Sequence, residues 1–206
     1  QRKEQSIDWD IRLLKRRQLV TERRLGDEIE YVFKHALVQE TIYEDITKKT
    51  RRELHRQVGE AIETVFADSL QDFHGMLAYH FSRAEVPEKA EEYLFMAGDE
   101  AARSAASTEA LHYFQEASRL YFAIHGEGGD ITRKALLEKN IGLALLNKGN
   151  LIESIDHFNR ALALLGEPVP TGPFAVGLGF ARDLVVLLAR LFLNRLSGTA
   201  GKNDTD

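Results

Sequence analysis

The stretch LLEKNIGLALLNKGNLIESIDHFNRALALL, residues 136–165, decides the fold class. Two helical patterns flank Lys148-Gly149-Asn150, where the glycine can adopt the left-handed backbone conformation that ends a helix. The first pattern places small Gly142 among large apolar residues, and the second carries apolar residues, Phe158 among them, at three- and four-residue spacing. A small residue on one helix lets its neighbour approach closely, and an aromatic side chain fills the remaining space. The stretch therefore predicts a tight helical hairpin.

The same spacing recurs along the chain, with steps of 12, 4 and 3 residues. Its three occurrences are Ala78, Ala90, Leu94 and Ala97; Gly98, Ala110, Phe114 and Ala117; and Gly142, Ser154, Phe158 and Ala161. A small residue, then a second small residue, a bulky residue and an alanine is the order found in tetratricopeptide repeats. We therefore predict an α-solenoid, a stack of such hairpins.

The distances between the three sets are unequal. The second and third sets lie 44 residues apart, against about 34 in a standard repeat. The excess matches Ala123 to Thr132 (AIHGEGGDIT), for which we expect a longer connection or an extended helix end. The first two sets lie only 20 residues apart, so one helix, residues 87–104, is expected to serve both. The first set is then degenerate or a cap.

Composition excludes several classes of site. The 206 residues have room for one large domain or two small ones and contain no cysteine, which excludes disulfides and thiolate chemistry and fits a cytoplasmic protein. The net charge of −5 divides into +3 over residues 1–56 and −8 over the rest. This asymmetry suggests two units, and the acidic part argues against wholesale nucleic-acid binding. The polar start predicts no signal peptide, and the missing initiator methionine suggests a fragment of a longer protein.

The first 66 residues predict a different arrangement. Residues 7–19 form an amphipathic pattern with a basic face, and residues 19–33 predict a β-hairpin turning at Gly26-Asp27, with Ile29, Tyr31 and Phe33 on its half-buried side. Two helices should follow, over residues 35–45 and 47–66. Helix, hairpin and helix are compatible with a partial winged-helix unit. Its arginines are interleaved with acidic residues, so a solvated surface is the simpler interpretation, with DNA contact as the alternative.

Two blocks resemble a known family. The segment YVFKHALVQETIYEDITKKTRRELHRQVGEAIE, Tyr31 to Glu63, resembles the region that follows the ATPase module in bacterial signalling ATPases of the STAND type. Its matching positions are Phe33, His35, Ala36, Leu37, Gln39, Glu40, Tyr43, Arg51, Arg52, Leu54 and His55. Leu77 to Ser104 resembles the start of the repeats in the same proteins. Many of them carry a class III adenylate/guanylate cyclase domain at the N-terminus, so the resemblance implies a regulatory region.

No catalytic motif is recognisable in the chain. Glycines 126, 128 and 129 are not followed by the Lys-Ser/Thr of a phosphate loop, and neither a pair of cyclase-type metal-binding aspartates nor a nucleophile elbow is present. The seven histidines form no HExxH motif and no i,i+4 pair, so structural or surface roles are expected for them. We therefore expect no enzyme, metal or cofactor within these residues. Any ATPase or cyclase module would lie outside them.

A binding groove is expected on the concave face of the repeats, which the first helix of each hairpin lines. On this register the groove residues are Glu92, Phe95, Asp99, Arg103, Lys139, Leu143, Leu146 and Asn147. A mixture of apolar and charged side chains suits an extended peptide or a neighbouring helix. The alternative is that other helices of the same protein close this face.

The C-terminal part begins with a stop at Gly166 to Pro170. Residues 174–196 (FAVGLGFARDLVVLLARLFLNRL) are long enough to span a bilayer, but Arg182, Asp183 and Arg190 fall inside the segment and do not gather on one clean polar face. A helix packed on the repeats or on a missing subunit is favoured. A membrane-surface helix and a true span are the alternatives.

The predicted fold is mainly α, an α-solenoid of tetratricopeptide-like hairpins preceded by a partial winged-helix-like unit with one β-hairpin. Its domains are residues 1–70 for that unit and its connecting helices, 71–166 for the repeats, 167–196 for the hydrophobic helix and 197–206 for a disordered tail. The predicted function is a non-catalytic regulatory module that binds a protein partner or a neighbouring ATPase or cyclase domain. The alternative is a fragment of a DNA-binding transcriptional regulator with a helical-repeat sensor.

Overall fold

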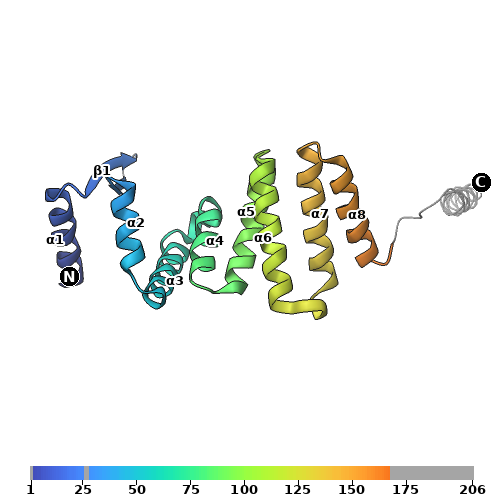
Figure 1. Cartoon of the computed structure of the whole chain (residues 1–206), viewed down its shortest axis with the longest axis horizontal. Coiled ribbons are helices and arrows are strands. Elements are labelled where there is room, and N and C mark those ends of the chain that lie inside the picture. The colour runs from blue at the N-terminus through green and yellow to red at the C-terminus, as the bar shows by residue number, and fades with distance from the viewer. Residues whose placement is uncertain (1, 26–27, 168–206) are drawn as a thin grey trace, which may run out of the picture. The chain divides into compact units, whose positions relative to one another are not determined.

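The structure is a computed structural model that describes residues 2–25 and 28–167. These residues form eight α-helices and one two-stranded antiparallel sheet, so the prediction of a mainly helical protein with one β-hairpin is confirmed (Figure 1). The chain divides into two compact units, residues 1–97 and 98–206. The two units are described separately below. The predicted segments 174–196 and 197–206 lie outside the described residues.

The first unit contains the sheet and the first helices. In chain order its elements are α1 (Arg2–Arg16), β1 (Val20–Leu25), β2 (Glu28–Phe33), α2 (Ala36–Asp45), α3 (Lys48–Val65), the short 3-10 helix η1 (Ala67–Phe73), α4 (His74–Arg83) and the first part of α5 (Pro87–Arg103). The predicted order of helix, hairpin and helix is therefore confirmed. The assignment of this part to a winged helix stays a prediction.

The hairpin has the predicted antiparallel pairing, from Val20 opposite Phe33 to Leu25 opposite Glu28. On the side predicted to be half-buried, Ile29 is 50% and Tyr31 43% exposed, whereas Phe33 is half-buried and lies opposite buried Val20. The prediction is therefore right at Phe33 and wrong at Ile29 and Tyr31. A two-stranded sheet has too little area to cover a full apolar face by itself. Alternation along one strand could not show this, since burial depends on what packs against the strand.

Helix α3 packs on α4 through a close glycine contact. Its N-terminus is capped by Thr47, whose hydroxyl accepts a hydrogen bond from the amide of Thr50. Gly59 faces α4 so closely that a Cβ there would lie 2.9 Å from Cζ of Phe81. Phe81 is buried and also stacks on Tyr93 of α5, with ring centroids 5.6 Å apart. One phenylalanine of α4 therefore joins three helices of the first unit.

The second unit contains the end of α5 from Gly98, α6 (Ser107–His125), the short 3-10 helix η2 (Gly126–Gly128), α7 (Ile131–Asn147) and α8 (Leu151–Leu164). A Cβ on Gly98 would lie 2.7 Å from the ring of Phe114, and one on Gly142 would lie 2.8 Å from the ring of Phe158. The predicted pairing of small and bulky residues is thus a real contact in both hairpins. The other small members of these two sets are all buried: Ala110, Ala117, Ser154 and Ala161.

One left-handed residue ends the first helix of each hairpin. Glu85, Ala105 and Gly149 have φ of 55°, 60° and 85°, and each lies seven residues after the first member of its set. In each case the next amide donates to the carbonyl five residues back, in Val86 to Phe81, Ala106 to Ala101 and Asn150 to Leu145. These bonds cap the helix carbonyls in a Schellman-type turn. The sequence signalled only Gly149, because the other two turns use residues that do not favour this conformation.

The long connection between the second and third sets is also present. Helix α6 continues to His125, η2 follows, and Asp130 caps α7 by accepting from the amide of Thr132 at 3.0 Å. The ammonium of Lys134 is buried here and donates to the carbonyl of Glu127 at 2.6 Å. The prediction for residues 123–132 is therefore confirmed, as an extended helix end and a longer connection together.

One further expectation concerns the helix shared by two sets. Helix α5 is continuous from Pro87 to Arg103, so it carries Ala90 and Leu94 of the first set and Gly98 of the second, as predicted.

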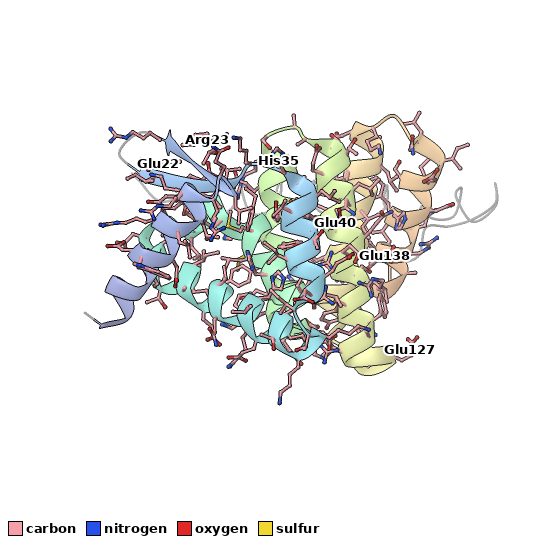
Figure 2. All side chains as sticks on the ribbon, turned by 60° about the vertical axis from the view of Figure 1, so that its left-hand side comes forward. Glu22, Arg23, His35, Glu40, Glu127 and Glu138 are labelled. Carbon is pink, nitrogen blue, oxygen red and sulfur yellow. The ribbon has the colours of Figure 1, made fainter. Side chains whose placement is uncertain are left out.

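Among the helices in residues 2–25 and 28–167, none combines the length and the apolar character that crossing a bilayer demands. Helices α7 and α8 are linked by His157, whose Nδ1 lies 2.7 Å from the carboxylate of Glu138. Figure 2 labels Glu138.

Candidate binding groove

A pocket of about 350 Å³ opens within the second unit, between the end of α5, the start of α6 and α7. Its polar lining residues are Asp99, Arg103, Ser107, Asn140 and Asn147, and its apolar ones are Ala102, Ala110, Phe114, Leu143 and Ala144. The pocket thus combines convergent polar groups with apolar surface, which is the usual composition of a binding site.

Small residues create the hollow. Ala110 and Ala144 are buried and end at Cβ, so the walls of the pocket stand back from its centre. Phe114 is also buried, because its ring is drawn against Gly98 on the neighbouring helix. The residues that pack the hairpin therefore also shape the pocket beside it.

The polar groups of the pocket are connected across two helices. Asn140 of α7 is only 7% exposed, and its amide nitrogen donates to Oδ1 of Asp99 on α5 at 3.4 Å. This bond is long for a hydrogen bond to a carboxylate, and a carboxylate has about four lone-pair sites. Asp99 can therefore accept a further donor from a ligand without losing Asn140.

A cation stands at the mouth of the pocket. Arg103 is exposed and pairs with Glu100, one turn earlier on α5. The hydrogen bond to Glu100, its charge and that of Asp99 raise the pKa of Arg103, so the guanidinium stays charged. The mouth consequently presents a cation next to the Asp99 carboxylate, an arrangement that suits the alternating donors and acceptors of a peptide.

The structure brings four of the eight predicted groove residues together in this pocket: Asp99, Arg103, Leu143 and Asn147. Leu146 is exposed on α7 but does not line the pocket. Lys139 lines a different groove, described next. Glu92 and Phe95 lie on the part of α5 that belongs to the first unit.

Sequence reasoning missed the other six lining residues of the pocket. Asn140 carried a usable signal, because it stands three residues before Leu143 and seven before Asn147 and so shares their helix face. Ala102 carried the same kind of signal, because it stands three residues after Asp99 on α5. Ser107 carried none, since its place follows from how α6 turns away from α5.

A second groove of about 440 Å³ lies between α7 and α8. It is lined by Thr132, Ala135, Leu136, Lys139, Phe158, Ala161, Leu162 and Leu165. Its surface is almost wholly apolar, and among these described lining residues Lys139 is the charged one. This groove has no convergent polar groups that would orient a small molecule.

A pair of histidines, His55 and His80, lies in the first unit, outside the two grooves. His55 is buried, and its two ring nitrogens lie 3.0 Å from the Tyr43 hydroxyl and 3.0 Å from Nδ1 of His80. Burial lowers the pKa of both histidines, Arg83 and Arg51 lower that of His55 further, and His55 lowers that of His80. The two Nδ1 atoms lie at hydrogen-bond distance and join α3 to α4, which is a structural role of the kind expected for His55.

A second polar cluster joins α3 to α5 within the first unit. The Glu63 carboxylate accepts from Lys89 Nζ at 2.6 and 2.9 Å and from the Tyr93 hydroxyl at 2.6 Å. Burial and the bond to Glu63 raise the pKa of Tyr93, which therefore stays a hydrogen-bond donor. In the described part of the chain, no group of three or more His, Asp or Glu residues is placed to hold a metal ion. The contacts of the first cluster join α3 to α4, and those of the second join α3 to α5.

The comparisons with known proteins show no family for this chain. No family model matches the chain, and no solved structure matches it. A protein of Rhizobium meliloti (strain 1021), named "Uncharacterized protein R02095", is 33% identical over 98 residues, which are 48% of this chain and 10% of that protein. The matched part of the chain thus spans about a tenth of the length of this relative.

Proposed function

We propose that the chain is a non-catalytic protein-interaction module whose tetratricopeptide-like hairpins present the α5–α6–α7 pocket to a peptide segment of a partner. The observation that carries the proposal is the pocket itself, in which a buried amide, a carboxylate and a cation surround an apolar centre. Each of these groups comes from a helix held in place by the hairpin contacts.

The tetratricopeptide-like interpretation is supported by two repeated features. The contact of Gly98 with Phe114 is reproduced by Gly142 with Phe158, at the same 16-residue separation. The left-handed residue that ends the first helix recurs at the same offset in both hairpins, at Ala105 and Gly149. Repeats that agree in packing and in turn geometry are expected to stack in the same way.

The pocket chemistry favours an extended peptide over a compact ligand. Asn140 and Asn147 each carry an amide that can donate and accept, as a peptide backbone requires. Leu143 and Phe114 offer apolar contact to one side chain of such a peptide. The pocket is at the small end of the range for ligand sites, so it would hold one or two residues.

A regulatory role within a long signalling protein is the second part of the proposal. It rests on the resemblance of Tyr31 to Glu63 and Leu77 to Ser104 to STAND-type ATPases, and a relative about ten times longer than the match fits a module of a large chain. Partner binding to the repeats would bias the docking of an attached ATPase or cyclase domain. Such an effect is a coupling free energy between two sites.

In the first unit, basic side chains of α1 and the hairpin pair with acidic ones, which speaks against the DNA-binding alternative. Lys15 pairs with Glu22, and Arg23 pairs with Glu30 at 3.0 Å across the hairpin. Glu22 and Arg23 are labelled in Figure 2. Acidic partners lower the net positive charge that a phosphate backbone would meet. We therefore propose protein binding alone.

A displayed library of random peptides tests the proposal. Peptides selected on the chain should bind at least about tenfold more weakly to Ala102→Trp, in which an exposed alanine of the pocket gains a blocking ring. The matched control is Ala163→Trp, which places the same ring at an exposed alanine of α8 outside the pocket. Selected peptides that bind both variants equally well, or a library that yields no binder, would overturn the proposal.

A further inference from the structure

Helix α8 exposes an apolar stripe along its whole length. Leu151, Ile155, Leu162 and Leu165 are 58%, 56%, 37% and 56% exposed, and half-buried Phe158 completes the series. Their spacing of four, three, four and three residues places them on one helix face. A contiguous apolar surface of this kind marks a site of association.

The α7–α8 groove continues this stripe. Phe158, Leu162 and Leu165 belong to both features, and α7 adds Ala135 and Leu136. Polar groups in the groove are scarce, so a small polar ligand would find few partners there. Groove and stripe together are shaped for the apolar face of a helix, which inserts side chains at three- and four-residue spacing.

The chain supplies such a face a few residues further on. Residues 168–173 separate the end of the described chain from the apolar segment 174–196, and six residues reach up to about 20 Å. Within that segment Phe180, Leu184, Leu187 and Leu191 recur at spacings of four, three and four. As a helix its 23 residues would extend about 34 Å, enough to cover the roughly 21 Å from Leu151 to Leu165.

We propose that residues 174–196 dock as a helix in the α7–α8 groove of the same chain, with Phe180, Leu184, Leu187 and Leu191 against α8. This position leaves Arg182, Asp183 and Arg190 off the apolar stripe, whereas a membrane span would bury all three charges. A short connection also gives the segment a high effective concentration at the groove, which a second copy would lack. The proposal does not depend on the use of the α5–α6–α7 pocket.

Nitroxide labelling tests the docking, because the chain has no cysteine of its own. Asn159→Cys places the label on exposed α8 outside the groove, and amide signals of residues 180–191 should be broadened by it. A label at Arg119→Cys on α6 should broaden them less, because α7 lies between α6 and α8 (Figure 1). In a second sample, nitroxide-labelled chain without isotope is mixed with isotope-enriched chain without nitroxide. This sample should show no broadening, because the proposed contact lies within one chain.

Matched variants connect the result to the predicted face. Leu191→Glu places a charge on the docking stripe and should abolish the broadening, whereas Leu193→Glu, on the opposite side of the same segment, should leave it. Broadening in the mixed sample would assign the groove to a second copy. If the singly labelled chain shows no broadening and co-sediments with phosphatidylcholine–phosphatidylglycerol vesicles, the segment binds a membrane. Broadening in the mixed sample, or no broadening in the singly labelled chain with or without vesicle binding, would overturn the proposal.

Discussion

Gly98 of α5 lies against the ring of Phe114 of α6, so closely that a Cβ on the glycine would stand 2.7 Å from a ring carbon. Gly142 of α7 has the same relation to Phe158 of α8, at 2.8 Å. Real Cβ atoms do not approach carbon this closely. Each pair therefore fixes the distance between its two helices, and the glycine is required by contact with its neighbour.

We predict that Gly98→Ala and Gly142→Ala each lower the free energy of unfolding by about 1–3 kcal/mol, because the ring must move in a packed hairpin. This loss exceeds the gain of up to about 1 kcal/mol that alanine gives a helix over glycine. Urea denaturation followed by circular dichroism measures the change. Gly128→Ala is the control, since a Cβ there would meet nothing within 4 Å; a loss equal to that at Gly98 would contradict the contact argument.

The two phenylalanines should differ in their contribution to stability. Phe114 is 2% exposed, so Phe114→Ala should cost about 3–5 kcal/mol through lost burial and the cavity it leaves. Phe158 is half-buried among the described residues, at the edge of the α7–α8 groove. In Leu191→Glu, which should remove the docked segment from the groove, Phe158→Ala should therefore cost less than Phe114→Ala. The same denaturation experiment makes the comparison, and an equal loss at both positions in that background would contradict it.

The left-handed turns offer a stabilising substitution. Ala105 has φ of 60°, where a Cβ is strained, so Ala105→Gly should raise the free energy of unfolding by about 0.5–1 kcal/mol. Gly149→Ala introduces the same strain at φ of 85° and should lower it by about 1–2 kcal/mol. Thermal and urea unfolding would measure both. Ala163→Gly, within helical α8, is the control and should be destabilising.

Stability should fall as the pH drops below about 6.5, the ordinary value for histidine. His55 and His80 have lowered pKa values in the fold, mainly through burial, so below this pH the unfolded chain binds more protons than the folded one. The contribution of the two histidines to stability is fully present above the pKa that they have in the unfolded chain. It is lost as the pH falls toward the lower pKa that they have in the folded chain. The slope is at most about 1.4 kcal/mol per pH unit for each histidine.

His80→Gln removes one of these two titrating groups. The free energy of unfolding should then depend less on pH between about pH 5 and about pH 7. His112→Gln is the control, because it replaces an exposed histidine of α6. The groups that face the pair are Tyr43, Arg51, Tyr79 and Arg83, whose rings or charges lie against His55 and one another. An unchanged profile in His80→Gln would refute the role assigned to the pair.

Local patterns predicted much of the second unit and little of its surface. The spacing of Gly142, Phe158 and Ala161 was sufficient to pair α7 with α8, because helix periodicity and a three-residue turn fix which residues meet. The groove was harder to predict. Lys139 and Asn147 share α7 but line different grooves, since two turns of helix separate them and the faces they occupy depend on both neighbours of α7.

The first unit shows the same limit. The sequence located the β-hairpin and the buried position of Phe33, but not the exposure of Ile29 and Tyr31, because what covers a strand is set by distant residues. Gly59 meets Phe81 across 22 residues, and this contact escaped notice because η1 lies between α3 and α4 and breaks the 16-residue separation. His55 and His80 were visible as histidines, but their pairing requires the packing of α3 on α4.

The sequence by itself determined the mainly helical class, the hairpin at residues 20–33, the shared helix α5 and the two glycine–phenylalanine pairs. These features follow from periodicity and turns, which act over a few residues and are written in neighbouring positions. Only the tertiary structure decided which side chains form the α5–α6–α7 pocket, that α8 exposes an apolar stripe and that His55 lies against His80. These depend on the rotation of one helix against another, which the whole core sets together.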